Sequence, residues 1–234
     1  MKQITHILAK EFRDYFVSPI AYIVIAIFLV VTGWFFFSTF FLYDQATMRN
    51  FFSLLPLTFS FVIPAVTMRL FSEELSIGSY EVLLTMPVTP LDVILGKFLA
   101  SVAFVGAMLL PTLFYPFSIS LMGQLDWGPV IGGYLGAIFL GGAFAAIGLF
   151  ASALTRNQIV AFIIAMAICF ILTLLDKMLF FFPSSILSVI NYLGADFHFN
   201  TISRGIIDSR DVLYFLSVMF ISLYAARLAM QEKK

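Results

Sequence analysis

Long apolar runs separated by short polar segments dominate the chain. The runs cover residues 20–43, 51–70, 93–122, 130–154, 159–175 and 212–230. A helix needs about 20 apolar residues to cross the hydrocarbon core of a bilayer, and these runs do not alternate as barrel strands do. The pattern therefore predicts an all-α integral membrane protein with six transmembrane helices, which form a single domain over residues 1–234.

The first 18 residues are amphipathic rather than uniformly apolar. One helical stripe of this segment is apolar and consists of Ile4, Ile7, Leu8, Phe12, Tyr15 and Phe16. Most of the charges lie on the other side, namely Lys2, Lys10, Arg13 and Asp14. Helices with this pattern lie in the plane of the membrane interface. Residues 1–18 therefore predict an interfacial helix, which Ser18-Pro19 ends.

A polar segment at residues 71–92 separates the second and third apolar runs. It holds four carboxylates: Glu73, Glu74, Glu81 and Asp92. Charged side chains are costly in hydrocarbon, so we expect this segment to lie in water. Lys97, just inside the third run, is expected to snorkel to the membrane surface along its own aliphatic stem.

Stop and start signals inside this segment predict a short amphipathic helix. Gly78-Ser79 can end one helix and cap the next, and Met86-Pro87 ends that next helix. The helix between them carries three apolar side chains on one face: Tyr80, Leu83 and Leu84. Thr89-Pro90 begins the following helix, with Asp92 three residues after the cap. A short helix held between two spans is suited to contact something at the membrane surface.

Residues 180–210 are semi-apolar and irregular, which predicts one or two short surface helices rather than a span. Their end and the residue that follows carry four charges, at Arg204, Asp208, Arg210 and Asp211. We expect these to form an ion-pair network, with a contact to a substrate or partner as the alternative. His198 in this loop and His6 in the first helix are expected to be solvated.

Small residues recur every four positions in the fourth apolar run, at Gly133, Ala137, Gly141 and Ala145. Such a stripe lets helices approach closely. Packing within one subunit and a seam between two subunits are both consistent with it.

Composition and charge add an orientation. The chain is 62% hydrophobic and 11% charged with a net charge of zero, which gives no nucleic-acid footprint. If the N-terminus is inside, cytosolic segments hold nine of the thirteen Lys and Arg residues: Lys2, Lys10, Arg13, Arg69, Lys97, Arg156, Arg227, Lys233 and Lys234. The positive-inside rule then predicts cytosolic N- and C-termini and a cytosolic segment 71–92.

The sequence offers no catalytic or cofactor site of its own. It has no phosphate-binding Gly-x-x-x-x-Gly-Lys-Ser/Thr loop and no His-Glu-x-x-His or Cys-x-x-Cys metal motif. No predicted span has a charged residue near its centre, which argues against a proton- or ion-coupled transporter. We therefore predict a protein that is not an enzyme, holds no cofactor and receives its energy from elsewhere.

Three segments carry a resemblance to a known family. Residues 73–89 contain Glu73-Glu74, Gly78-Ser79, Glu81, Leu83-Leu84 and Pro87-Val88, and Gly96-Lys97 follows at the next span. This order resembles the coupling segment of ABC-2-type exporter permeases. Residues 10–19 resemble the elbow helix that opens those permeases, and residues 197–216 resemble the segment before their last span. The last segment is most similar to the gliding-motility permeases and their relatives in nitrous-oxide-reductase maturation.

The resemblance implies an architecture and a set of partners. It implies an N-terminal elbow helix, a cytosolic coupling helix between spans 2 and 3, and short outer-surface helices between spans 5 and 6, in a bacterial inner membrane. A separate ABC-type ATP-binding subunit would hold ATP and Mg and would dock on Glu73, Glu74, Gly78, Tyr80, Glu81, Leu83, Leu84 and Pro87. A second permease copy or paralogue and an auxiliary subunit with a periplasmic domain are the further partners implied, besides membrane lipid.

Two functions remain open at this stage. One is an ATP-driven exporter permease. The other is a membrane scaffold for assembly or cofactor maturation without classical transport. No polar cavity that would identify a substrate can be located in the sequence.

Overall fold

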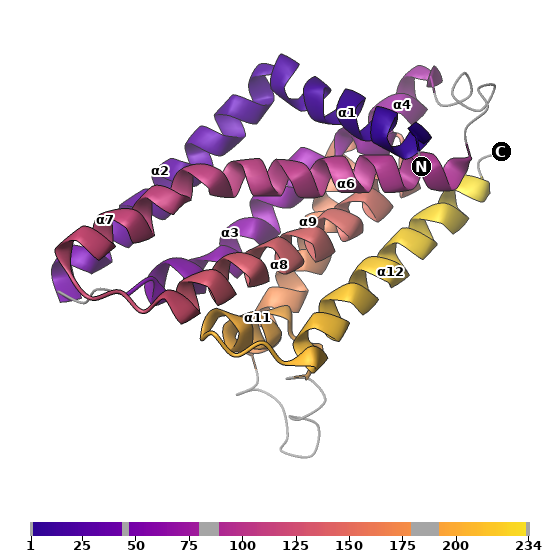
Figure 1. Ribbon diagram of the computed structural model, residues 1–234. Coiled ribbons are helices and arrows are strands. Elements are labelled where there is room, and N and C mark those ends of the chain that lie inside the picture. Colours follow the sequence, from indigo (N-terminus) through magenta and orange to yellow (C-terminus); the bar gives the residue numbers. More distant parts are fainter. Residues whose placement is uncertain (1, 44–46, 80–88, 179–191, 233–234) are drawn as a thin grey trace.

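The computed structural model describes residues 2–43, 47–79, 89–178 and 192–232, and helices make up this part of the chain (Figure 1). Five helical stretches are long and apolar enough to cross a membrane: Pro19–Ser38, Arg49–Ile77, Pro90–Leu121, Trp127–Leu154 and Ser209–Gln231. They confirm an all-helical membrane protein with multiple spans. The remaining predicted span is the apolar helix α9 (Gln158–Leu174), whose 17 residues are fewer than in the other five. The count of six spans stays a prediction.

The amphipathic N-terminal segment forms α1 (Lys2–Val17), and α2 (Pro19–Tyr43) follows after a break at Ser18. The apolar stripe of α1 packs on the protein itself. Tyr15 is buried, with its ring centroid 5.0 Å from that of Phe104. Ile7 lies so close to Gly96 that a side chain at Gly96 would collide with it. The stripe predicted to lie on the membrane thus covers the start of the third span. The position of α1 in the interface stays a prediction.

A joint at Met68 separates α3 (Arg49–Thr67) from α4 (Arg69–Ile77). The hydroxyl of Ser152, from another helix, fills this joint. It donates to the Met68 carbonyl at 2.8 Å and accepts from the amides of Phe71 at 2.9 Å and Ser72 at 3.0 Å. A side chain inserted at such a point is a common cause of an interrupted helix. The start of α4 is therefore held by a residue from outside α3 and α4.

Both ends of the polar segment have the predicted local structure. Gly78 follows α4 with a φ of 73°, a left-handed conformation that glycine adopts at helix ends without steric cost. Thr89 caps α6 (Pro90–Leu109) in a reciprocal capping box with Asp92. The predicted short helix between them, with Tyr80, Glu81, Leu83, Leu84 and Pro87, lies outside the described residues.

The third span bends where proline predicts it. α6 gives way to a 3₁₀ turn, η1 (Leu110–Leu113), and then to α7 (Phe114–Met122). Pro111 lies in η1 and Pro116 lies in α7. A proline ring clashes with the preceding turn of an α-helix, and the tighter turn relieves this clash.

The central helix is α8 (Trp127–Leu154), which packs against α3, α4, α6, α9, α11 and α12 (Figure 1). Its glycines allow this crowding. Gly133 lies directly against the ring of Phe52, and a Cβ at Gly141 would lie 2.6 Å from a methyl of Val105. For these two glycines, packing within one subunit is confirmed, because the residues against them belong to the same chain.

The segment between α9 and α12 (Ser209–Gln231) contains α11 (Ala195–Ser203). The prediction of a solvated His198 is wrong. The side chain has no exposed surface, stacks on the Tyr214 ring at 4.1 Å, and places Nδ1 2.6 Å from Asp211 Oδ1 and Nε2 2.9 Å from the Tyr192 carbonyl. The physical reason is that α11 is tucked against α8 and α12, so its polar side chains are enclosed.

The prediction of an ion-pair network among the four charges at residues 204–211 is also wrong. Asp211 pairs with His198, and Asp208 caps α12 by accepting from the Arg210 amide at 3.0 Å. Among the described residues, neither Arg204 nor Arg210 forms an ion pair. The carboxylates are engaged by a buried imidazole and a helix start, which compete successfully with exposed arginines.

Gly133→Leu should lower the free energy of unfolding by about 1–3 kcal/mol, because any side chain at this position meets the Phe52 ring. Thermal unfolding in detergent measures the effect. Gly106→Leu is the matched control, since no atom lies within 4 Å of a Cβ added there. Equal unfolding temperatures for the two variants would contradict the packing role of Gly133.

Candidate functional site

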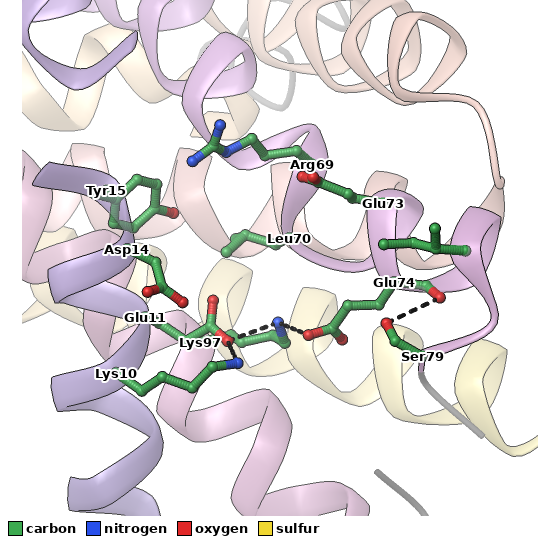
Figure 2. A pocket seen from close by; sticks show the side chains of 11 residues that line it. Lys10, Glu11, Asp14, Tyr15, Arg69, Leu70, Glu73, Glu74, Ser79 and Lys97 are labelled. Atoms are coloured by element: carbon green, nitrogen blue, oxygen red, sulfur yellow. Dashed lines mark hydrogen bonds and ion pairs between the residues drawn. The ribbon is translucent and has the colours of Figure 1, made fainter. Parts of the chain in front are cut away.

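A polar cleft lies between α1, α4 and α6, at the end of the molecule where both termini lie (Figure 1). Its volume is about 300 Å³, and α4 leads from it into the segment that precedes α6. The cleft is lined by seven charged residues: Lys10, Glu11, Asp14, Arg69, Glu73, Glu74 and Lys97. In a protein with so few charges, this is a notable concentration of them (Figure 2).

The centre of the cluster is the ammonium group of Lys97 on α6. Only 1% of the surface of Lys97 is exposed. Its Nζ atom lies 3.0 Å from Glu11 Oε1 of α1 and 2.8 Å from Glu74 Oε1 of α4 (Figure 2). The same Nζ lies 5.3 Å from the centroid of the Phe71 ring, within the range of a cation–π contact. The predicted snorkelling of Lys97 is wrong, because two carboxylates and an aromatic face replace water around the ammonium group.

This arrangement joins three helices that are distant in sequence. Glu11 precedes Lys97 by 86 residues and Glu74 precedes it by 23. Both carboxylates are mostly shielded from solvent, so the attraction is stronger than between exposed charges. The elbow-like helix α1 and helix α4 are thereby fixed to the start of the third span through one side chain.

The surrounding charges extend the cluster toward solvent. Lys10 is more exposed and lies 3.4 Å from Glu11. Partial burial opposes the charged form of Lys10, yet the carboxylates of Glu11, Glu74 and Asp14 raise its pKa above the ordinary value. Lys10 therefore stays protonated and adds positive charge at the mouth of the cleft.

The predicted docking residues take different positions around the cleft. Glu73 is exposed, whereas Glu74 faces inward to Lys97. Gly78 ends α4. The other five, Tyr80, Glu81, Leu83, Leu84 and Pro87, lie outside the described residues, so their docking role stays a prediction. Glu11 and Lys97 were missed as site residues, although Gly96-Lys97 and Lys10-Glu11 both lie in the segments that carry the family resemblance.

The ion pairs of the cleft connect α1, α4 and α6. Within the ranges that the structure describes, no group of three or more His, Cys, Asp or Glu residues could hold a metal ion. The central lysine is ion-paired on two sides and is thus not poised as a nucleophile. What the geometry provides is a charged link between a surface helix, the helix entering the polar segment, and a membrane span.

A family model described as "ABC-2 family transporter protein" matches residues 5–216, nearly the whole chain. No curated protein matches the chain significantly. The matched range includes α1 after its first three residues, the residues that line the cleft, and the whole of α11.

Lys97→Met should destabilise the protein by roughly 3–5 kcal/mol, because it leaves two shielded carboxylates without their cation. Lys10→Met is the matched control and should cost about 0–1 kcal/mol, since that ion pair is exposed to solvent. Thermal unfolding of both variants in the same detergent measures the difference. A Lys97→Met protein as stable as Lys10→Met would show that the buried pairs contribute no net stability.

Proposed function

This chain belongs to the ABC-2 transporter family, and from that premise we propose that it is the transmembrane permease subunit of an ATP-driven exporter. A separate ATP-binding subunit supplies the energy and holds ATP with Mg²⁺. The absence of a phosphate-binding loop from the sequence supports this division of labour. The chain itself provides the path through the membrane and a docking surface for the ATPase.

The ATPase docks, in this proposal, on residues 72–87. The apolar face of Tyr80, Leu83 and Leu84 enters a groove of the partner, and Glu73 and Glu81 meet its basic rim. The exposed position of Glu73 supports this role. Glu74 contributes from inside the cleft instead, by holding α4 to Lys97.

The observation that carries the proposal is the Lys97 junction. α4 runs directly into the docking segment, and the Glu74–Lys97 pair joins α4 to the third span, while the Glu11–Lys97 pair joins that span to α1. A displacement of the docking segment is thus transmitted to a membrane span and to the N-terminal helix together. An isolated docking loop would lack this connection.

The wider assembly follows from the family. We propose a pair of permease subunits, formed by two copies or by a paralogue, in a bacterial inner membrane with both termini in the cytosol. The similarity of residues 197–216 to gliding-motility permeases and their nitrous-oxide-reductase-maturation relatives supports an auxiliary subunit with a periplasmic domain. A membrane scaffold that assembles such machinery without transport is the alternative, and the ATPase would dock on it in the same way.

The orientation can be tested with single cysteines, because the native Cys169 is buried and shielded from reagents. Ser79→Cys should react with an impermeant maleimide only after the membrane is opened. Ile206→Cys, in the exposed turn after α11, should react in intact cells. The positive-inside distribution of Lys and Arg is the reason for this expectation. Labelling with the opposite pattern would reverse the proposed topology.

The docking surface can be tested by co-purification with the cognate ATP-binding subunit. Leu83→Ala with Leu84→Ala should weaken binding, since burial of each docked leucine side chain contributes about 1.5–3 kcal/mol to the binding free energy. Glu81→Lys should weaken it further, and more strongly at low salt, because rim charges act through a screened field.

Leu121→Ala with Leu193→Ala is the matched control, since both leucines are exposed and lie away from the cleft. It should leave co-purification unchanged. Thermal unfolding of each permease variant is measured in parallel. Full retention of the ATPase by the Leu83/Leu84 variant, with a normal unfolding temperature, would refute docking through this face.

A further inference from the structure

A polar cavity and a mainly apolar cavity share two lining residues, Tyr15 and Arg69. One is the polar cleft already described. The other is a narrow, mainly apolar groove that shares Tyr15 and Arg69 with the cleft and continues along Ile20, Ala21, Ala65, Val66 and Phe104. Tyr15 precedes the first span by four residues, and Arg69 follows Thr67 at the end of α3 by two. The junction of the two cavities therefore lies between the end of α1 and the start of α4.

Two hydrogen-bond donors at this junction lack an acceptor. The Tyr15 residue is 5% exposed, and its hydroxyl has no hydrogen-bond partner in the described part of the chain. Burial raises the pKa of Tyr15, so the phenol keeps its proton. Arg69 forms no ion pair with any described residue, and its guanidinium extends from α4 toward α1 on the side of Tyr15 (Figure 2). Buried polar groups such as the Tyr15 hydroxyl are normally satisfied, and Arg69 is only half-buried beside it, so an anionic ligand fits this pair of donors.

Two carboxylates of the same cleft also lack a cation. Lys97 is engaged by Glu11 and Glu74, which leaves Asp14 of α1 and Glu73 of α4 without an ion pair among the described residues. With Lys10, which pairs with Glu11 at 3.4 Å, the charged residues that line the cleft are three cations and four anions. A purely anionic ligand would be attracted by Arg69 and repelled by Asp14 and Glu73. A ligand with both signs of charge satisfies all of them.

We propose that the cleft binds a phospholipid with a phosphoethanolamine headgroup. The phosphate accepts hydrogen bonds from Tyr15 and Arg69, and the primary ammonium group donates to Asp14 and Glu73. The volume of the apolar groove is about 40 Å³, which holds only the first carbons of an acyl chain, so the rest of the chain extends past the exposed Ile20 into the surrounding lipid. Phosphatidylglycerol offers no cation to the two carboxylates. Phosphatidylcholine has a quaternary ammonium without N–H groups, so it cannot donate hydrogen bonds to them.

This site shares Glu73 with the proposed docking surface for the ATPase, whereas Tyr15, Arg69 and Asp14 lie outside that surface. A bound lipid bridges α1 and α4 on the open side of the Lys97 cluster. Its removal is expected to loosen α1 from α4 while the ion pairs of Lys97 persist.

The test measures thermal unfolding of the purified full-length chain in detergent with added dioleoyl-phosphatidylethanolamine, -phosphatidylcholine or -phosphatidylglycerol. Phosphatidylethanolamine should raise the unfolding temperature more than the other two lipids. Tyr15→Phe and Arg69→Gln should each remove at least half of that excess. The matched controls Tyr22→Phe, an exposed tyrosine on α2, and Arg227→Gln on α12 should retain it. Native mass spectrometry of the same samples counts the lipids retained.

Three outcomes would overturn the proposal. Equal stabilisation by the three lipids would mean that only acyl chains are bound. A larger effect of phosphatidylglycerol would mean that the cations alone select the headgroup. An undiminished phosphatidylethanolamine effect in both the Tyr15→Phe and Arg69→Gln variants would place the lipid elsewhere. Soluble phosphoethanolamine is included as a further arm, and an effect as large as that of the lipid would assign the site to a free ligand.

Discussion

Close approach of helices at α8 is the constraint on which the rest of the structure depends. Lipid tails are as apolar as the side chains they would replace, so burial from water does not drive helices together inside a bilayer. Dispersion contacts at short range must do so instead. The glycines of α8 let the neighbouring helices approach to that short distance. Gly133 and Gly141 admit Phe52 and Val105 on one side, while Gly132 allows the backbone of Ile202 and Gly205 to lie against α8 on the other. The remaining spans are arranged around this surface.

The Lys97 cluster solves a different problem at the end of the same bundle. A charge removed from water costs free energy unless partners replace the lost hydration. Glu11 and Glu74 provide those partners, and the Phe71 ring covers a further side of the ammonium group. Because the two partners come from α1 and α4, the electrostatic requirement of one side chain fixes the relative positions of three helices.

The features that could be predicted from sequence are those with local signals. The break at Ser18-Pro19, the left-handed Gly78 and the capping box of Thr89 with Asp92 each depend on residues within a few positions of one another. The enclosure of Lys97 and of His198 could not be predicted in the same way. Lys97 meets a carboxylate 86 residues earlier, and His198 meets one 13 residues later on another helix. Whether a polar side chain is solvated depends on such distant partners, and periodicity along the chain carries no information about them.

The hydroxyl of Ser152 has a mechanical consequence. It engages the Met68 carbonyl and the amides of Phe71 and Ser72 in the first turn of α4, so the near end of α4 is fixed to the central helix as well as to α3. α4 can then tilt as a lever arm about its contact with Ser152 of α8. With nine residues and a rise of about 1.5 Å per residue, its arm is about 13 Å long, so a tilt of about 10° moves its far end by about 2 Å. Glu74 is the sixth of the nine residues of this helix, so Lys97 is displaced by somewhat more than half of what the tip travels.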